Sequence, residues 1–201
     1  TPSRSSAASD VYKRQPHTDN PYRKPGAPGI QFLHCLKNEV SGGFSTLVDG
    51  FSVAEYIKLN DPEAFGSLTK TNLRYRFQDK DIILENWGEL IELDKDGDYK
   101  QVRYSTRVDY VPPLENEKLE RFYKARKLLG DLYTSSDFEI KFKLSPGDVM
   151  MFDNHRLLHG RTSYDSSEGA RHLQGCYLEF DSTDGKLRHL HKKYHLSETN
   201  L

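Results

Sequence analysis

The feature that most constrains the fold of this 201-residue chain is the separation along the sequence of three side chains that suit one metal ion. His17 and Asp19 are two residues apart, so in an extended segment both point to the same face. His159 lies far downstream, in a polar stretch that follows an apolar run. Two imidazoles and one carboxylate form the facial ligand set of non-haem Fe(II) oxygenases, which leaves coordination positions open. The fold must bring early and late segments together for these residues to form one site.

A His-x-Asp pair is weak evidence by itself, because the chain has 8 histidines and 30 acidic residues and a surface pair is the simpler explanation. The hypothesis of a metal site gains support from His159 and from Arg171, which is the first residue of a second strand-like run. A guanidinium one strand away from a metal can hold a carboxylate in a bidentate fork, as the far end of 2-oxoglutarate would require. His155 remains a weaker alternative to His159 as a ligand.

Five blocks of sequence stand in a fixed order along the chain: HTDNPY at 17–22, PGIQFLHCL at 28–36, GGFSTLVDGF at 42–51, FDNHRLLHGR at 152–161 and RHLQGCY at 171–177. Together they resemble the gamma-butyrobetaine dioxygenase and trimethyllysine dioxygenase family. That family belongs to the wider taurine-dioxygenase-like group of Fe(II)/2-oxoglutarate oxygenases. The resemblance covers residues 16–195.

The resemblance implies that His17, Asp19 and His159 hold Fe(II), with 2-oxoglutarate as co-substrate and O₂ as oxidant. It places Arg171 on the far carboxylate of 2-oxoglutarate, with Ser45 and Leu33 lining the same pocket. Each of the last two has a plain alternative. Ser45 also suits a turn, and an aliphatic residue such as Leu33 on a buried strand needs no further role.

The resemblance also implies residues that bind the substrate. Tyr177 matches an aromatic position that helps to enclose a trimethylammonium group, although core packing is the alternative. Where the family has paired asparagines, one of which holds the substrate carboxylate, this chain has Ser105, Thr106 and Arg107. Hydroxyls and a cation also suit an anion, so a phosphonate or sulfonate becomes an option.

The sequence therefore predicts an Fe(II)- and 2-oxoglutarate-dependent dioxygenase that hydroxylates a small trimethylammonium substrate, with gamma-butyrobetaine to carnitine as the first expectation. Trimethyllysine and a compound such as trimethylaminoethylphosphonate are the alternatives. A third alternative is an inactive fragment, because family members carry an upstream portion before the metal motif. Residues 16–201 are then the carboxy-terminal part of the catalytic domain, and residues 1–15 a disordered tail or a non-native segment.

Many short strand-like runs separated by a few helices predict a mainly β fold with helical insertions, and the resemblance implies a double-stranded β-helix, or jelly-roll, lacking its upstream portion. The strongest helix pattern spans residues 115–133. Asp96-Gly97 predicts a hairpin turn. A capping box predicts that a helix starts at Ser52, with Glu55 three residues later, and the segment 20–29 predicts a loop that would carry an active-site lid.

Composition excludes several classes of partner. A net charge of −1, with 29% charged residues, gives no electrostatic case for nucleic acid or for an anionic membrane. No apolar run approaches the roughly 18 residues of a membrane span. The two cysteines, Cys35 and Cys176, lie in apolar runs and predict buried free thiols in a cytoplasmic, reducing compartment. The sequence does not fix the oligomeric state, and a homodimer is retained as one expectation.

Overall fold

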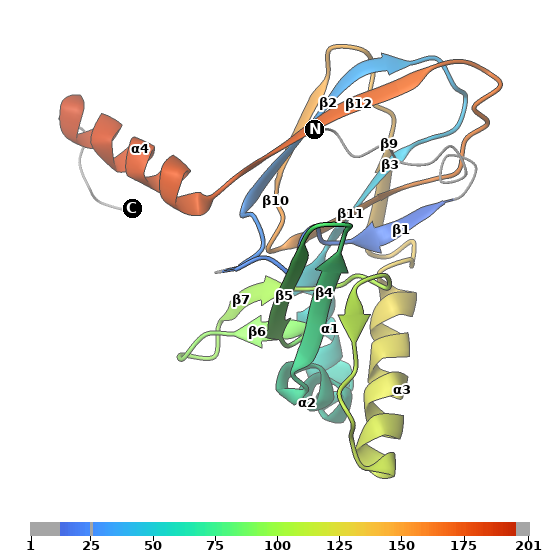
Figure 1. The fold of residues 1–201 in the computed structure, drawn as a ribbon, viewed down its shortest axis with the longest axis vertical. Coiled ribbons are helices and arrows are strands. Elements are labelled where there is room, and N and C mark those ends of the chain that lie inside the picture. Colours follow the sequence, from blue (N-terminus) through green and yellow to red (C-terminus); the bar gives the residue numbers. More distant parts are fainter. Residues whose placement is uncertain (1–12, 25, 196–201) are drawn as a thin grey trace.

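The computed structural model describes residues 13–24 and 26–195 (Figure 1). Within these residues the fold is β-rich with helices, as the sequence predicted. Figure 1 shows two sheets at one end of the molecule and helices α1, α2 and α3 at the other. The helix predicted at residues 115–133 agrees within a few residues with a helix of the structure, Asn116–Leu132.

The first sheet carries two of the three candidate metal ligands. It has the strand order β1-β11-β3-β9, with every neighbouring pair antiparallel. Its strands are β1 (Arg14–His17), β11 (Leu157–Arg161), β3 (Ser45–Asp49) and β9 (Glu139–Phe142). The order places the first described strand directly beside a strand from the last quarter of the chain.

The second sheet has the order β10-β2-β12 and is also antiparallel. Its strands are β10 (Val149–Asp153), β2 (Ile30–Asn38) and β12 (Arg171–Leu178). A small core joins the two sheets: buried Cys35, Met150 and Phe152 of this sheet pack with the partly buried Leu47 of β3 and Leu157 of β11. The two sheets therefore pack against each other through this core.

The larger core lies at the helical end. Helices α1 (Gly50–Asn60), α2 (Pro62–Lys70) and α3 (Asn116–Leu132) pack there, and Ile57, Leu68, Phe122 and Leu129 are fully buried. The remaining strands are β4 (Leu73–Gln78), β5 (Ile83–Gly88) and β8 (Asp109–Tyr110) in one sheet, and the hairpin of β6 (Ile91–Leu93) and β7 (Tyr99–Val102). The hairpin turns at Asp96-Gly97 as predicted, where Gly97 takes a φ of +90°.

The predicted start of α1 was wrong. The helix begins at Gly50, and Asp49 caps it by accepting hydrogen bonds from the backbone N–H groups of Phe51 and Ser52. Glu55 makes no capping box with Ser52 and instead accepts a hydrogen bond of 2.7 Å from the hydroxyl of Tyr99. A carboxylate at the end of β3 is in place to cap first, so the helix starts earlier than the local motif indicates.

Two further expectations need correction. Cys35 is buried as predicted, but Cys176 is exposed, because β12 is an edge strand of its sheet. The C-terminal helix α4 (Phe180–Lys193) projects away from β12 in Figure 1 and has no buried residue. Of the predicted tail 1–15, residues 1–12 lie outside the described part, whereas Arg14 and Gln15 already belong to β1. Among the described helices, none is both long and apolar enough to cross a membrane.

Candidate metal centre and its cavity

Backbone pairing brings the candidate ligands together. His17 is the register partner of His159 in the antiparallel pair of β1 and β11. Directly after β1, the backbone N–H of Thr18 donates to the carbonyl of Tyr104, and the Thr18 hydroxyl accepts from the N–H of Tyr104. Thr18 is buried, so its side chain points away from the metal ligands, as an extended segment requires. His17 and Asp19 are therefore fixed on the opposite face.

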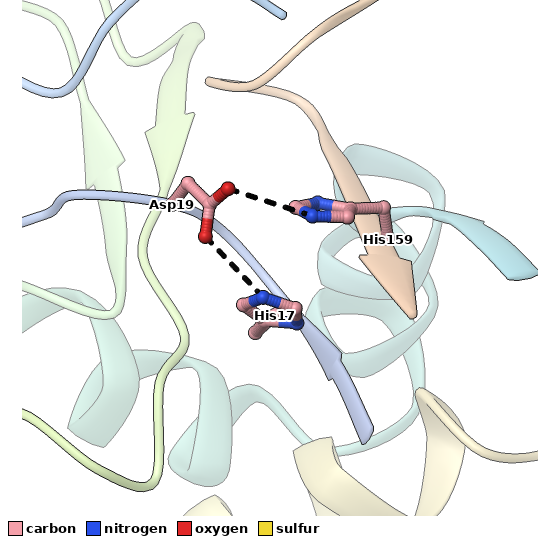
Figure 2. Close-up of side chains that lie close together, drawn as sticks. All are labelled: His17, Asp19 and His159. Carbon is pink, nitrogen blue, oxygen red and sulfur yellow. Dashed lines mark ion pairs between the residues drawn. The ribbon is translucent and has the colours of Figure 1, made fainter. Parts of the chain in front are cut away.

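The three side chains converge on one point (Figure 2). One ligand atom from each of His17, Asp19 and His159 lies within 4.8 Å of the other two. The Nε2 atom of His17 is 3.3 Å from Oδ1 of Asp19, and Nε2 of His159 is 3.6 Å from Oδ2 of the same carboxylate. The two imidazole rings have their centroids 4.4 Å apart. The structure thus brings together the three residues that the sequence singled out.

Electrostatics favours the protonation states that a metal needs. Burial would raise the pKa of Asp19, but its contact with His17, the nearby His159 and a hydrogen bond from Tyr177 outweigh burial and hold that pKa well below its usual range. Burial and the neighbouring His17 lower the pKa of His159 to about 3, against the opposing effect of Asp19. A carboxylate and a neutral imidazole are the forms that coordinate a cation.

The residues present fit a metal ion. Nε2 of His17 is buried and makes no hydrogen bond to any described residue, although an unsatisfied buried polar atom is costly. Nδ1 of the same ring lies 2.9 Å from the carbonyl of Gln15, and a proton donated there would leave Nε2 able to bind a metal. An imidazole whose outer nitrogen is held by a backbone carbonyl is the usual form of a metal-binding histidine.

Gln31 and Asn154, which the sequence did not single out, support Asp19 together with Tyr177. Its Oδ2 accepts hydrogen bonds from Nε2 of Gln31 at 2.9 Å and from the hydroxyl of Tyr177 at 2.7 Å. Its backbone N–H donates to Oδ1 of Asn154, whose own amide donates back to the Asp19 carbonyl. Period-two alternation on β2, which puts Gln31 on the face of Leu33, could have suggested Gln31. Nothing local could have suggested Asn154, because its partner is at the other end of the chain.

The segment after Asp19, for which the sequence predicted an active-site lid, is hydrogen-bonded to neighbouring segments. Asn154 also donates to the carbonyl of Pro28, and Nε2 of His155 contacts the carbonyl of Ala27 at 2.7 Å. Asn86 of β5 donates to the carbonyls of Pro21 and Arg23. Both halves of this loop are therefore anchored to neighbouring segments. His155 has this separate role and is not among the residues that gather as ligands.

One cavity of about 1260 Å³ opens onto the three ligands. Every residue that the sequence proposed for the site lines it: His17, Leu33, Asp19, Ser45, Ser105, Thr106, Arg107, His159, Arg171 and Tyr177. Asp19 is its acidic lining residue, and its cationic ones are Lys13, Arg14, Arg107, Arg161 and Arg171. A cavity with this balance favours anionic ligands once a divalent cation has neutralised Asp19.

Arg171 lies at one side of this cavity. Its guanidinium donates to the carbonyl of Gly43 at 3.2 Å and lies over the ring of Tyr164, with 5.4 Å between the guanidinium carbon and the ring centroid. Gly43 has a φ of +69°, and a side chain there would come within 2.8 Å of Nε of Arg171. The guanidinium carbon of Arg161, two residues after His159 on β11, lies 4.7 Å from the centroid of the same ring. The sequence did not single out Arg161 or Tyr164.

The proposed substrate residues lie at two places on the cavity wall. Ser105 is buried and Thr106 and Arg107 are more exposed, in the segment that follows β7. Tyr177 is on β12, opposite Gln31 of β2, with its hydroxyl on Asp19. Tyr22 and Phe77, stacked with centroids 5.1 Å apart, also line the cavity.

Comparison with known proteins identifies the family of this chain. Residues 1–177 match the family model described as "Taurine catabolism dioxygenase TauD, TfdA family". Gamma-butyrobetaine dioxygenase of Homo sapiens is 38% identical over 183 residues, which are 88% of this chain and 47% of that protein. The protein of that name from Pseudomonas sp. (strain AK-1) is 34% identical over 82% of this chain and 43% of its own length. Mitochondrial trimethyllysine dioxygenase of Bos taurus is 34% identical over 82% of this chain and 40% of its own length.

Solved structures share the fold at lower identity. Asparagine oxygenase in complex with Fe(II), 2S,3S-3-hydroxyasparagine and succinate superposes with a TM-score of 0.66 at 18% identity, covering 84% of this chain and 50% of that one. AAD-2 in complex with Mn(II) and N-oxalylglycine gives 0.65 at 16% identity, covering 85% and 69%. The chain spans less than half the length of the curated relatives named above. The chain belongs to the TauD/TfdA family of Fe(II)- and 2-oxoglutarate-dependent dioxygenases.

Proposed function

We propose that this chain carries the catalytic centre of an Fe(II)- and 2-oxoglutarate-dependent dioxygenase, with His17, Asp19 and His159 as the metal ligands. The observation that carries the proposal is the convergence of these three ligand atoms within 4.8 Å, in a cavity that Arg171 also lines. Iron(II) bound there would supply the centre at which 2-oxoglutarate and O₂ react to oxidise a C–H bond.

The protein's own share of the chemistry is to bind and orient. The two imidazoles of His17 and His159 and the carboxylate of Asp19 would hold the metal, a ligand set that leaves coordination positions open for 2-oxoglutarate and O₂. Arg171 would hold the far carboxylate of 2-oxoglutarate, because its planar guanidinium can donate two parallel hydrogen bonds. Its contacts with Gly43 and Tyr164 fix the direction of that guanidinium before any ligand binds. Ser45 and Leu33 would complete this part of the wall.

For the substrate we propose a small trimethylammonium compound with an acidic end, with gamma-butyrobetaine first. The family relatives named gamma-butyrobetaine dioxygenase support this choice. Tyr177, with Tyr22 nearby, can offer ring faces to the cation, an attraction of roughly 0.5 to 2 kcal/mol per ring. Ser105, Thr106 and Arg107 can bind the acidic end. Because they replace an amide with hydroxyls and a cation, trimethylaminoethylphosphonate remains the alternative substrate, with trimethyllysine.

Other expectations stay proposals. The two facing sheets support a double-stranded β-helix for residues 16–201, and the relatives' greater length supports a longer catalytic domain. An inactive fragment is the competing proposal for this chain alone. A cytoplasmic location and a homodimer are proposed from the sequence only.

The test is succinate formation from 2-oxoglutarate with Fe(II) and each of the three substrates in turn. We expect gamma-butyrobetaine to stimulate succinate release most. A matched control is 4-aminobutyrate, which keeps the carboxylate but lacks the three methyl groups, so it should stimulate weakly if aromatic rings recognise the cation. If trimethylaminoethylphosphonate stimulated succinate release as strongly as gamma-butyrobetaine, the assignment of gamma-butyrobetaine as the substrate would be wrong. Metal binding without turnover on any substrate would favour the inactive fragment.

A further inference from the structure

The carboxylate of Asp19 is held by a pair of donors that face each other across two strands. Gln31 of β2 and Tyr177 of β12 are register partners, and both donate to Oδ2 of Asp19, at 2.9 Å and 2.7 Å. Oδ1 receives neither of these hydrogen bonds and lies 3.3 Å from Nε2 of His17. The two oxygens of one carboxylate therefore have different partners.

The buried side-chain amide of Gln31 carries a cost in folding stability. Its side chain is 2% exposed, and its Oε1 atom is buried without a hydrogen-bond partner among the described residues. Leaving a buried acceptor unsatisfied costs about 1–3 kcal/mol. The other amide atom, Nε2, makes its hydrogen bond to Asp19. The hydrogen bond that this side chain makes is thus to a candidate metal ligand.

We infer that Gln31 is a positioning residue for the metal centre: with the Tyr177 hydroxyl it fixes the rotation of the Asp19 carboxylate. This inference rests on the proposed function, because it gives Gln31 a role toward the bound metal. It also gives Tyr177 a second role besides cation recognition. Two donors on Oδ2 limit the rotation of the carboxylate, so that Oδ1 stays near Nε2 of His17, at 3.3 Å, and Oδ2 near Nε2 of His159, at 3.6 Å. Groups that orient a metal ligand in this way change metal affinity by about 10- to 100-fold when removed.

The test uses Gln31→Met, which keeps an unbranched side chain and removes both the donor to Asp19 and the unsatisfied Oε1. Co(II) is the probe, because its visible absorption reports the geometry of its ligands and it needs no O₂ chemistry. We expect Co(II) affinity to fall about 10- to 100-fold with an altered spectrum. Resistance of the metal-free protein to urea should be unchanged or raised, because the unsatisfied atom is gone.

A matched control exists elsewhere in the chain. Gln101 is also buried, also donates to a carboxylate (Oε2 of Glu92 at 2.9 Å), and also has a buried Oε1 without a described partner. It does not line the metal cavity. Gln101→Met should therefore leave Co(II) affinity and spectrum as in the parent. Tyr177→Phe should lower Co(II) affinity as well. In the double variant with Gln31→Met, the loss of Co(II) binding free energy should differ from the sum of the two single losses, because both residues act on one oxygen.

The outcomes separate the inference from the proposed function. Tight Co(II) binding by the parent with the same affinity and spectrum in Gln31→Met would overturn the inference alone. Equal losses of affinity in Gln31→Met and Gln101→Met would do the same, because the effect would then be a general one of core packing. A parent chain whose Co(II) binding does not depend on His159 would overturn the metal site and the role of Gln31 together.

Discussion

His17 and His159 lie directly opposite each other in the antiparallel pair of β1 and β11, and their ring centroids are 4.4 Å apart. This one pairing explains how ligands from the beginning and the end of the chain meet. Neighbouring strands lie about 5 Å apart, so opposite residues on one face are close enough to share an ion. Asp19 follows two residues later and completes the set.

Replacing His159 with alanine should abolish metal binding and turnover, because the two remaining ligands cannot hold the ion in place. Co(II) titration and succinate release measure the two effects. His155→Ala is the matched control, since that ring contacts the carbonyl of Ala27 and is not one of the gathered ligands. Full activity in His159→Ala, or loss of Co(II) binding in His155→Ala alone, would move the site to the other histidine.

Arg171→Lys should raise the concentration of 2-oxoglutarate needed for half-maximal succinate release by about 10- to 100-fold, because a lysine cannot donate the paired hydrogen bonds of a guanidinium. Co(II) affinity should stay close to that of the parent. Arg76→Lys on β4, whose guanidinium contacts Gln78 outside the cavity, is the control. An unchanged 2-oxoglutarate requirement in Arg171→Lys would place the co-substrate anchor elsewhere, with Arg161 the next residue to test.

Replacement by valine should change the free energy of unfolding differently at two buried threonines. The Thr18 hydroxyl accepts from the backbone N–H of Tyr104 at 3.1 Å, so Thr18→Val leaves that buried N–H unsatisfied and should lower the free energy of unfolding by about 1–3 kcal/mol. Thr46 on β3 is equally buried, but its hydroxyl has no partner among the described residues. Thr46→Val should be neutral or stabilising in urea unfolding. Equal losses in the two variants would contradict the role given to the Thr18 hydroxyl.

Acid should remove a stabilising contribution from Asp49. Burial raises the pKa of this carboxyl, but its hydrogen bonds with Arg156 and with the N–H of Ser52 outweigh burial and lower it. A group whose pKa is lower in the folded state stabilises the fold above its unfolded pKa, about 3.9, and this contribution is lost as the pH falls below that value.

Asp49→Asn keeps a good helix-capping acceptor while it removes the charge. We expect the parent to exceed this variant in free energy of unfolding at about pH 7, and the difference to shrink toward about pH 3. Urea unfolding of both proteins across that range measures it. A difference that stays constant with pH would show that the charge of Asp49 does not contribute.

Much of this protein could be predicted from local sequence. Helix α3 follows from its apolar period and the β6–β7 turn from Asp96-Gly97, because each depends on residues close together in the chain. The metal ligands and Arg171 were identified by their chemistry and by the resemblance of five sequence blocks to a family. Their shared cavity agrees with that identification.

Tertiary structure decided the rest. Asp49 rather than Ser52 caps α1, and Gln31, Asn154 and Tyr177 hold Asp19 through contacts that join distant parts of the chain. No local pattern specifies such partners, because strand order and register determine which side chains meet across a sheet. The sequence by itself determined which residues have the chemistry to bind a metal, and the pairing of β1 with β11 decided that these residues meet at one point.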